Sequence, residues 1–86
     1  MPDQNDKYCV YILESFKNGK YYIGCTTSLS QRLEYHNNGL SPYTRKFRPW
    51  QLKYVEKYST LKEARTRENK LKQWKNRDRL NSLINT

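Results

Sequence analysis

The chain has 86 residues, with 17 Lys and Arg against 8 Asp and Glu, and a formal net charge of +9. This length fits one small domain, and an apolar content of 35% allows only a thin core. A folded basic domain has a polyanion as its expected partner, and nucleic acid ranks ahead of an acidic membrane surface. No apolar stretch approaches the roughly 20 residues that span a bilayer, so we expect no membrane span.

The N-terminal residues 1–6 are polar and acidic and carry no apolar signal region. We expect them to form a short disordered lead to one domain over residues 7–86. Cys9 and Cys25 lie in apolar runs without the spacing of a metal site, so both are predicted to be reduced packing residues. These features predict a cytoplasmic protein, and a monomer is the expected state.

Apolar and turn patterns predict three strands and three helices. In chain order they are strands 7–14 and 20–26, a helix 28–38, a basic loop 40–49, a strand 50–58 and helices 60–74 and 77–84. The order ββαβαα predicts an α+β fold, a small three-stranded and partly antiparallel sheet flanked by helices.

Turn and cap residues support several of these boundaries. Asn18-Gly19 is typical of a hairpin turn between the first two strands. Ser28 with Gln31, and Thr60 with Glu63, match capping boxes that would begin the first and second helices.

The second helix carries a carboxylate on the face that should be buried. At 100° per residue, its positions within one arc narrower than a quadrant are Leu61, Ala64, Glu68 and Leu71. Leaving such a group unpaired costs several kcal/mol, since even a neutral polar group costs roughly 2 to 7 kcal/mol. Glu68 is explained by a bound cation or by a buried salt bridge with a local arginine.

The first helix shows the same pattern. Leu29, Arg32, Leu33 and His36 fall within about 100° of one another, so two polar groups share the apolar edge. Two helices with polar, chemically capable groups directed inward predict a site, although His36 could instead be a core or helix-edge residue.

The first two strands bring tyrosines to one sheet face. With an even hairpin loop, that face carries Tyr11, Leu13, Tyr22, Gly24 and Thr26. Gly24 leaves room beside the two phenols, and a glycine within a strand often marks close approach of a ligand or another backbone. The alternative is that the tyrosines are core residues and the glycine marks a bulge.

These residues together resemble a known family. The motifs are Cys9-Val10-Tyr11, Tyr22-Ile23-Gly24, Arg32, His36 and Glu68, within YIGCTTSLSQRLEYHNNG and a later EARTREN helix. They resemble the GIY-YIG nuclease superfamily over about residues 7 to 75, and most of all its small bacterial proteins that consist of this domain alone. The resemblance implies a small sheet with helices on its faces.

The resemblance also implies roles in phosphodiester hydrolysis that leaves a 3′-hydroxyl and a 5′-phosphate. Tyr11 would position or deprotonate the attacking water, and Tyr22 would line the same cleft. Arg32 would contact the scissile phosphate, and His36 would assist at the nucleophile. Glu68 would bind one divalent cation, Mg²⁺ or Mn²⁺. Either Tyr11 or His36 could be the general base, because histidine titrates nearer neutrality and tyrosine near pH 10.

Two positions depart from the family pattern. The first motif reads Cys-Val-Tyr in place of Gly-Ile-Tyr, which keeps the tyrosine. Cys25 stands where some members carry a lysine, so catalysis would depend more strongly on Arg32.

Further basic residues predict a nucleic-acid track. They are Arg45, Lys46 and Arg48 on the loop, with Lys72 and Lys75 near the C-terminal helices. Such contacts set affinity and salt dependence without selecting a sequence. Tyr43, Phe47 or Trp50 could stack on unpaired bases, although Trp50, within a strand, is expected to pack.

The predicted function is a metal-dependent endonuclease with structure-selective or weak sequence selectivity. DNA is the expected substrate, in repair or recombination, and no small-molecule cofactor is expected. The alternatives are a catalytically idle nucleic-acid-binding module and a basic adaptor that docks on another protein.

Overall fold

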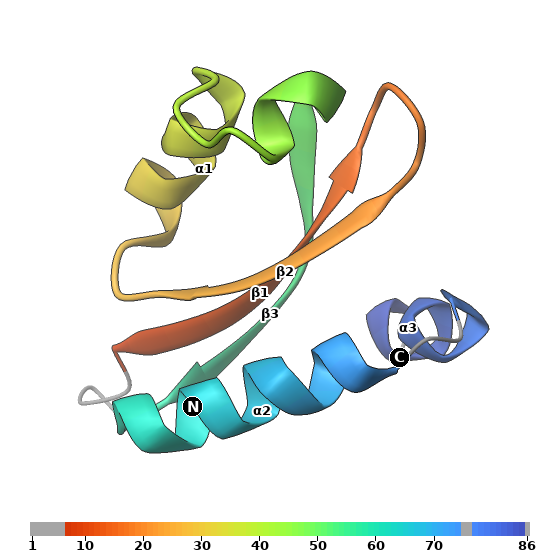
Figure 1. Ribbon diagram of the computed structural model, residues 1–86. Coiled ribbons are helices and arrows are strands. Elements are labelled where there is room, and N and C mark those ends of the chain that lie inside the picture. Colours follow the sequence, from red (N-terminus) through yellow and green to blue (C-terminus); the bar gives the residue numbers. More distant parts are fainter. Residues whose placement is uncertain (1–6, 75–76, 86) are drawn as a thin grey trace.

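The computed structural model describes residues 7–74 and 77–85 (Figure 1). Its elements are β1 (Tyr8–Ser15), β2 (Tyr21–Thr26), α1 (Leu29–Asn37), the 3₁₀ helix η1 (Thr44–Phe47), β3 (Trp50–Tyr58), α2 (Leu61–Gln73) and α3 (Arg77–Ile84). The predicted ββαβαα order and α+β class are confirmed, and η1 is an added turn of helix. The predicted lead, residues 1–6, lies outside the described residues.

The three strands form one sheet in the order β2-β1-β3, and both pairings are antiparallel, whereas the sequence predicted a partly antiparallel sheet. Tyr11 lies opposite Gly24, and Leu13 lies opposite Tyr22. The predicted shared face of these residues is therefore confirmed. A register shift between Ile12 and Leu13 affects only the pairing with β3.

Helices cover both faces of this sheet (Figure 1). Helices α2 and α3 lie over a core cluster of Val10, Ile12, Ile23, Ala64, Leu71 and Leu80. Helix α1 and η1 lie over a second cluster, Tyr11, Leu13 and Trp50, joined by Tyr22, Leu29, Leu33 and Phe47. Even-numbered residues of β1 face the first cluster and odd-numbered ones face the second, as expected for alternating strand residues.

Helix α1 begins without the predicted capping box. Ser28 precedes the helix, but its side chain makes no capping hydrogen bond. Its backbone N–H instead donates to Thr26 Oγ1 at 3.1 Å, because the connection from β2 is so short that this hydroxyl reaches it. The predicted end is confirmed, since Asn38 caps α1 and Gly39 has a φ of 77°.

The loop of residues 40–49 is anchored to β3 by two side chains. Asn37 accepts from Trp50 N at 2.6 Å and donates to Trp50 O at 3.1 Å. The indole N–H of Trp50 donates to Thr44 O at 2.8 Å, and its side chain is buried. Trp50 therefore packs, as expected, and is not available to stack on a base.

Helix α2 is capped by Thr60, whose hydroxyl accepts from Glu63 N at 3.2 Å, as the capping box predicted. Ala64 and Leu71 are buried, but Leu61 is 43% exposed. Its predicted burial is wrong, because Leu61 is the first residue of α2 and lies beyond the buried part of the helix.

Cys9 and Cys25 are free thiols, one buried and one half-buried. No helix among the described residues is long and apolar enough to cross a membrane.

Candidate active site

The site begins at Tyr11, in the centre of β1. Its side chain is only 2% exposed and lies against Gly24 on the neighbouring strand. A Cβ atom on Gly24 would come within 2.5 Å of Tyr11 Cζ. Gly24 therefore makes room for the phenol of Tyr11. The close approach predicted at this glycine is made by a tyrosine side chain, and the β1–β2 pairing has no bulge there.

The hydroxyl of Tyr11 is the first member of a buried, hydrogen-bonded row of three polar side chains. Tyr11 Oη lies 3.1 Å from His36 Nε2, and His36 Nδ1 lies 2.8 Å from Thr44 Oγ1. His36 is 2% exposed and Thr44 is completely buried. We call these three residues the Tyr–His–Thr row. Thr44 was not predicted, since nothing in the sequence sets this residue of a basic loop apart.

Tyr22 lies beside this row and continues it toward the surface. Its ring meets that of His36 edge-on at 4.9 Å between centroids, and the ring of Tyr43 lies 6.1 Å away. Tyr43 is 55% exposed. The aromatic rings thus connect buried His36 to solvent through half-buried Tyr22.

Arg32 projects from α1 into solvent. Its guanidinium lies 5.1 Å from the ring of Tyr35, and both line a hollow of about 380 Å³ beside the start of α1. The prediction that Arg32 shares the apolar edge is wrong, because its long side chain carries the charge outward while Leu29 and Leu33 pack inward. The guanidinium still acts electrostatically on Tyr11 and His36.

Glu68 lies on α2 with a side chain that is 13% exposed. Its Oε2 pairs with Lys72 Nζ at 2.9 Å, one turn along the helix. Its partner is therefore a lysine and not the local arginine considered from the sequence. The carboxylate also raises the pKa of both Tyr11 and Cys25, which shows that α2 brings its charge near the edge strand β2.

Burial decides the charge states of the row. It is the main cause that raises the pKa of Tyr11, with Tyr22 and Glu68 adding to the increase and Arg32 opposing it. Burial also lowers the pKa of His36, and Arg32 lowers it further. Both groups are consequently neutral at neutral pH. A substrate phosphate or a cation at this site would change that balance.

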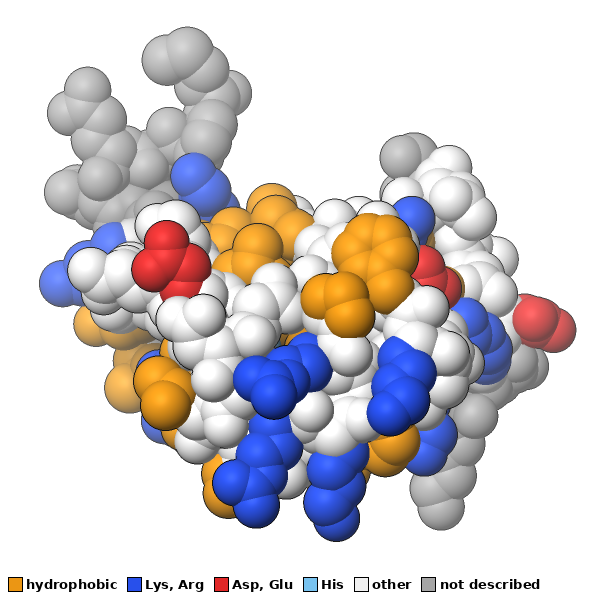
Figure 2. Space-filling view, turned by 90° about the horizontal axis from the view of Figure 1, so that it is seen from above, with side chains coloured by type: hydrophobic (Ala, Val, Ile, Leu, Met, Phe, Trp, Pro, Cys, Tyr) orange, Lys and Arg blue, Asp and Glu red, His pale blue; other side chains and the backbone are white. Residues whose placement is uncertain are grey.

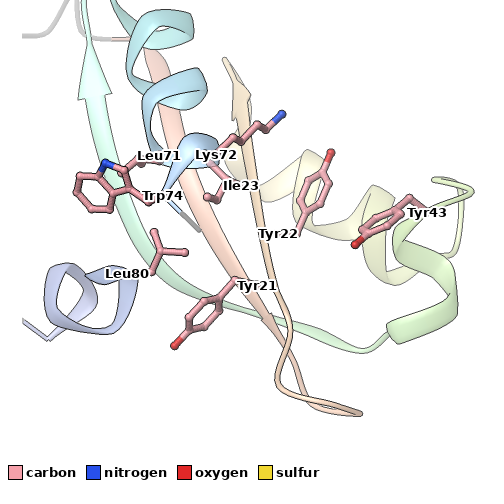
Figure 3. Close-up of a pocket in the computed structure, with 8 residues that line it drawn as sticks. All are labelled: Tyr21, Tyr22, Ile23, Tyr43, Leu71, Lys72, Trp74 and Leu80. Atoms are coloured by element: carbon pink, nitrogen blue, oxygen red, sulfur yellow. The ribbon is translucent and has the colours of Figure 1, made fainter. Parts of the chain in front are cut away.

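A groove of about 460 Å³ runs around β2 next to Tyr22 (Figure 3). Its lining comprises Tyr21, Tyr22, Ile23, Tyr43, Leu71, Lys72, Trp74 and Leu80. Figure 3 shows Tyr22 and Tyr43 on one side of the strand and Trp74 and Leu80 on the other. Arginines lie over its rings, with Arg77 4.2 Å from Tyr21 and Arg79 4.2 Å from Trp74. Arginine side chains therefore cover two of the aromatic rings that line the groove.

The predicted nucleic-acid contacts divide into three groups. Arg45, Lys46 and Arg48 are exposed on the loop that adjoins α1. Seen from that side, Lys and Arg side chains gather along the surface among patches of apolar residues (Figure 2). Lys72 lines the groove but is paired with Glu68. Lys75 lies outside the described residues.

Comparison with known proteins agrees with this architecture. Residues 7–81 match the GIY-YIG catalytic domain. A UPF0213 protein of Bacillus cereus is 38% identical over 71 residues, which cover 81% of this chain and 73% of that protein. The UPF0213 protein of Staphylococcus saprophyticus is 37% identical over 76 residues, which cover 87% of this chain and 92% of that protein. The solution NMR structure of a UPF0213 protein from Bacillus halodurans has a TM-score of 0.56 and 31% identity, covering 88% of this chain and 81% of that one. The chain belongs to the GIY-YIG family and has its nuclease fold.

Proposed function

We propose that this protein is a metal-dependent endonuclease that hydrolyses phosphodiester bonds, with DNA as its substrate and structure-selective or weak sequence selectivity. One observation carries the proposal. The hydroxyl of Tyr11 is held by His36, while the charges of Arg32 and Glu68 both act on it. A phenol on which both a cation and a carboxylate act is suited to handle a proton beside a phosphate.

The roles follow from what each group offers. Arg32 is exposed at a hollow beside Tyr35, where its planar guanidinium can donate to two phosphate oxygens. Tyr11 orients the attacking water, and Tyr22 lines the groove beside it. As the water oxygen bonds to phosphorus, the bond between phosphorus and the 3′ oxygen breaks. The water gives up one proton and the 3′ oxygen gains one, which leaves a 3′-hydroxyl and a 5′-phosphate.

Glu68 fits a cation site in which the protein supplies a single carboxylate. Among residues 7–74 and 77–85, no group of three His, Cys, Asp or Glu residues gathers as a ready-made metal site. Mg²⁺ often takes one or two protein carboxylates and keeps several waters, so Glu68 alone is sufficient when phosphate oxygens complete the shell. A divalent cation bound there would neutralise charge on the phosphate and the departing oxygen. Lys72 has to release the carboxylate first.

The path of the nucleic acid is the basic side of the molecule. Exposed Arg45, Lys46 and Arg48 lie on the α1 side. The groove beside Tyr22 adds aromatic faces on which bases can stack, with Tyr43 the most exposed of its rings. These contacts bind a backbone and unpaired bases without selecting a sequence.

One feature favours the alternative of an idle nucleic-acid-binding module. The Glu68–Lys72 ion pair neutralises the carboxylate that the cation needs. Under that alternative the basic surface binds nucleic acid and the site does not cut it.

The deciding experiment compares labelled single-stranded, duplex and flapped DNA with Mg²⁺, with Mn²⁺ and with a chelator. Glu68→Gln is the test variant, and Glu63→Gln on the exposed start of the same helix is the matched control. We expect cleavage that needs both the metal and Glu68, with DNA binding kept in the Glu68 variant. Binding without cleavage in every reaction would favour the idle module. Weak binding at physiological salt would favour the basic adaptor.

A further inference from the structure

Both ring nitrogens of His36 are engaged inside the protein. Nε2 meets Tyr11 Oη at 3.1 Å, and Nδ1 meets Thr44 Oγ1 at 2.8 Å. A neutral imidazole has one N–H donor and one bare acceptor nitrogen, so the row can be ordered in two ways. Either Nδ1–H donates to Thr44 and Tyr11 donates to Nε2, or the Thr44 hydroxyl donates to Nδ1 and Nε2–H donates to Tyr11.

The burial of Thr44 distinguishes these two orders. Its side chain is completely buried, and within the described part of the chain His36 is the one hydrogen-bond partner of Oγ1. If Nδ1 carried the proton, the hydroxyl hydrogen of Thr44 would be left without an acceptor in a dry site. An unsatisfied buried donor of this kind costs about 1 to 3 kcal/mol.

The backbone around Thr44 holds the hydroxyl in place. The carbonyl of Thr44 accepts the indole N–H of Trp50 at 2.8 Å, and Asn37 clamps the backbone of Trp50. Because η1 is anchored in this way, the backbone of Thr44 holds Oγ1 beside His36 Nδ1. Tyr11 is 2% exposed and its hydroxyl lies at Gly24 on the edge strand, so the hydrogen that this order leaves without a described acceptor is on the side of the row where the proposed substrate binds.

We propose that Thr44 is a positioning residue, which donates to His36 Nδ1 and so keeps the proton on Nε2, where it hydrogen-bonds Tyr11 Oη. His36 then acts as a donor to Tyr11 Oη and fixes the direction in which the hydroxyl hydrogen of Tyr11 points. It does not take the proton from water, so Tyr11 is the group that faces the substrate. The kinetic part of this inference rests on the proposed nuclease function, whereas the position of the proton does not.

The lowered pKa of His36 supports this arrangement, since the ring stays neutral near pH 7. The groups around the ring are Tyr11, Tyr22, Tyr35 and Arg32. None of these described neighbours is a carboxylate that would favour the imidazolium.

The position of the proton can be observed directly, because the chain contains one histidine. In protein labelled with ¹⁵N, the shifts of the two ring nitrogens report which one bears hydrogen. We expect a protonated Nε2 and a bare Nδ1 in the wild type and in Thr44→Ser. In Thr44→Val, which removes the hydroxyl and keeps the shape, we expect a clear population with the proton on Nδ1. A wild-type protein with the proton on Nδ1 would overturn the proposal.

The kinetic test separates positioning from simple loss of structure. We expect Thr44→Val to lower kcat about tenfold to a hundredfold with KM nearly unchanged, and Thr44→Ser to restore most of it. His36→Gln, whose amide N–H can still donate to Tyr11, should retain more activity than His36→Leu. An unchanged kcat in Thr44→Val, or equal losses in the two His36 variants, would contradict the proposal.

The NMR measurement and the kinetic measurement distinguish failure of this inference from failure of the proposed function. If no DNA is cleaved by the wild type, the proposed function fails, and the ¹⁵N shifts still decide the order of the row. If Thr44→Val does not fold, the wild-type ¹⁵N shifts still decide the order of the row, and the two His36 variants still test whether a donor to Tyr11 matters for kcat.

Discussion

The two faces of the sheet each hold tyrosine hydroxyls, and their partners differ in charge. On the α2 face, Tyr54 and Tyr58 donate to the carboxylate of Glu56 at 2.6 and 2.7 Å, and Arg67 donates to both of its oxygens. On the α1 face, Tyr11 meets the neutral ring of His36, while the charges of Arg32 and Glu68 act on it without a hydrogen bond to it in the described structure.

This difference explains why similar residues have different roles. The α2-face cluster neutralises its own charge, and burial together with the bond to Glu56 raises the pKa of Tyr58 to about 12. Such a cluster joins β3 to α2 and leaves little chemistry available. Within the described residues, His36 is the one hydrogen-bond partner of the Tyr11 hydroxyl. The partner of a tyrosine therefore decides whether it stabilises the fold or serves a site.

The largest expected contrast comes from removing one hydroxyl on each face. Tyr11→Phe should lower the cleavage rate about 10²- to 10⁴-fold while the protein stays folded, because the phenol handles the proton at the reacting phosphate. Tyr54→Phe should lower the free energy of unfolding by about 1 kcal/mol and leave the rate unchanged. Initial rates on one labelled DNA and urea unfolding measure both. Similar rates for the two variants would remove the distinction between the faces.

Gly24 and Cys25 are neighbours on β2 that face opposite sides of the sheet. Gly24→Ala places a Cβ within 2.5 Å of Tyr11 Cζ, so the phenol must move. We expect a loss of about 1 to 3 kcal/mol in unfolding free energy from overpacking. The cleavage rate should fall at least about tenfold, since a shift near 1 Å is costly in an active site. Cys25→Ala should change both quantities little. A fully active Gly24→Ala would mean that Tyr11 tolerates displacement.

Glu56 should make the stability of the α2 face depend on pH. Burial alone would raise its pKa, but hydrogen bonds from Arg67, Tyr54 and Tyr58 outweigh it, and the pKa lies below the ordinary 4.5. The unfolded chain then binds more protons, so this contribution is complete above about pH 4.5 and is lost as pH falls through the folded value.

Glu56→Gln should therefore lower the unfolding free energy by about 1 to 3 kcal/mol at pH 7, and by less at pH 3. Urea unfolding at several pH values measures the difference, with exposed Glu34→Gln as control. A difference that stays constant down to pH 3 would show that the charge of Glu56 is not what its partners stabilise.

The smallest effect is expected from surface charge. Arg45→Ala with Lys46→Ala should weaken DNA binding and reduce the slope of log K against log salt by about 1.4 to 1.8, if both residues contact phosphates. Lys62→Ala with Lys70→Ala removes the same charge from exposed positions on α2 and should change the slope less. Binding titrations at several salt concentrations measure both slopes. Equal slopes for the two pairs would show that DNA does not prefer the α1 side of the protein to α2.

Much of the fold could be predicted from local signals. Strand alternation placed Tyr11, Tyr22 and Gly24 on one face, and the register confirms it. The Thr60–Glu63 capping box and the Asn38-Gly39 stop also appear in the structure. The capping box at Ser28 is absent: the Ser28 side chain makes no capping hydrogen bond, and the Ser28 N–H, which Gln31 would accept in such a box, donates to Thr26 Oγ1.

The sequence by itself determined the element order, the basic character and the family motifs, because these depend on residue type and on spacings within about ten residues. Tertiary structure alone decided the partners. Thr44 meets His36 because η1 folds back over α1, and the charge of Glu68 on α2 acts on Tyr11 in β1. Such pairings depend on how separate elements pack, and helical or strand periodicity carries no information about them.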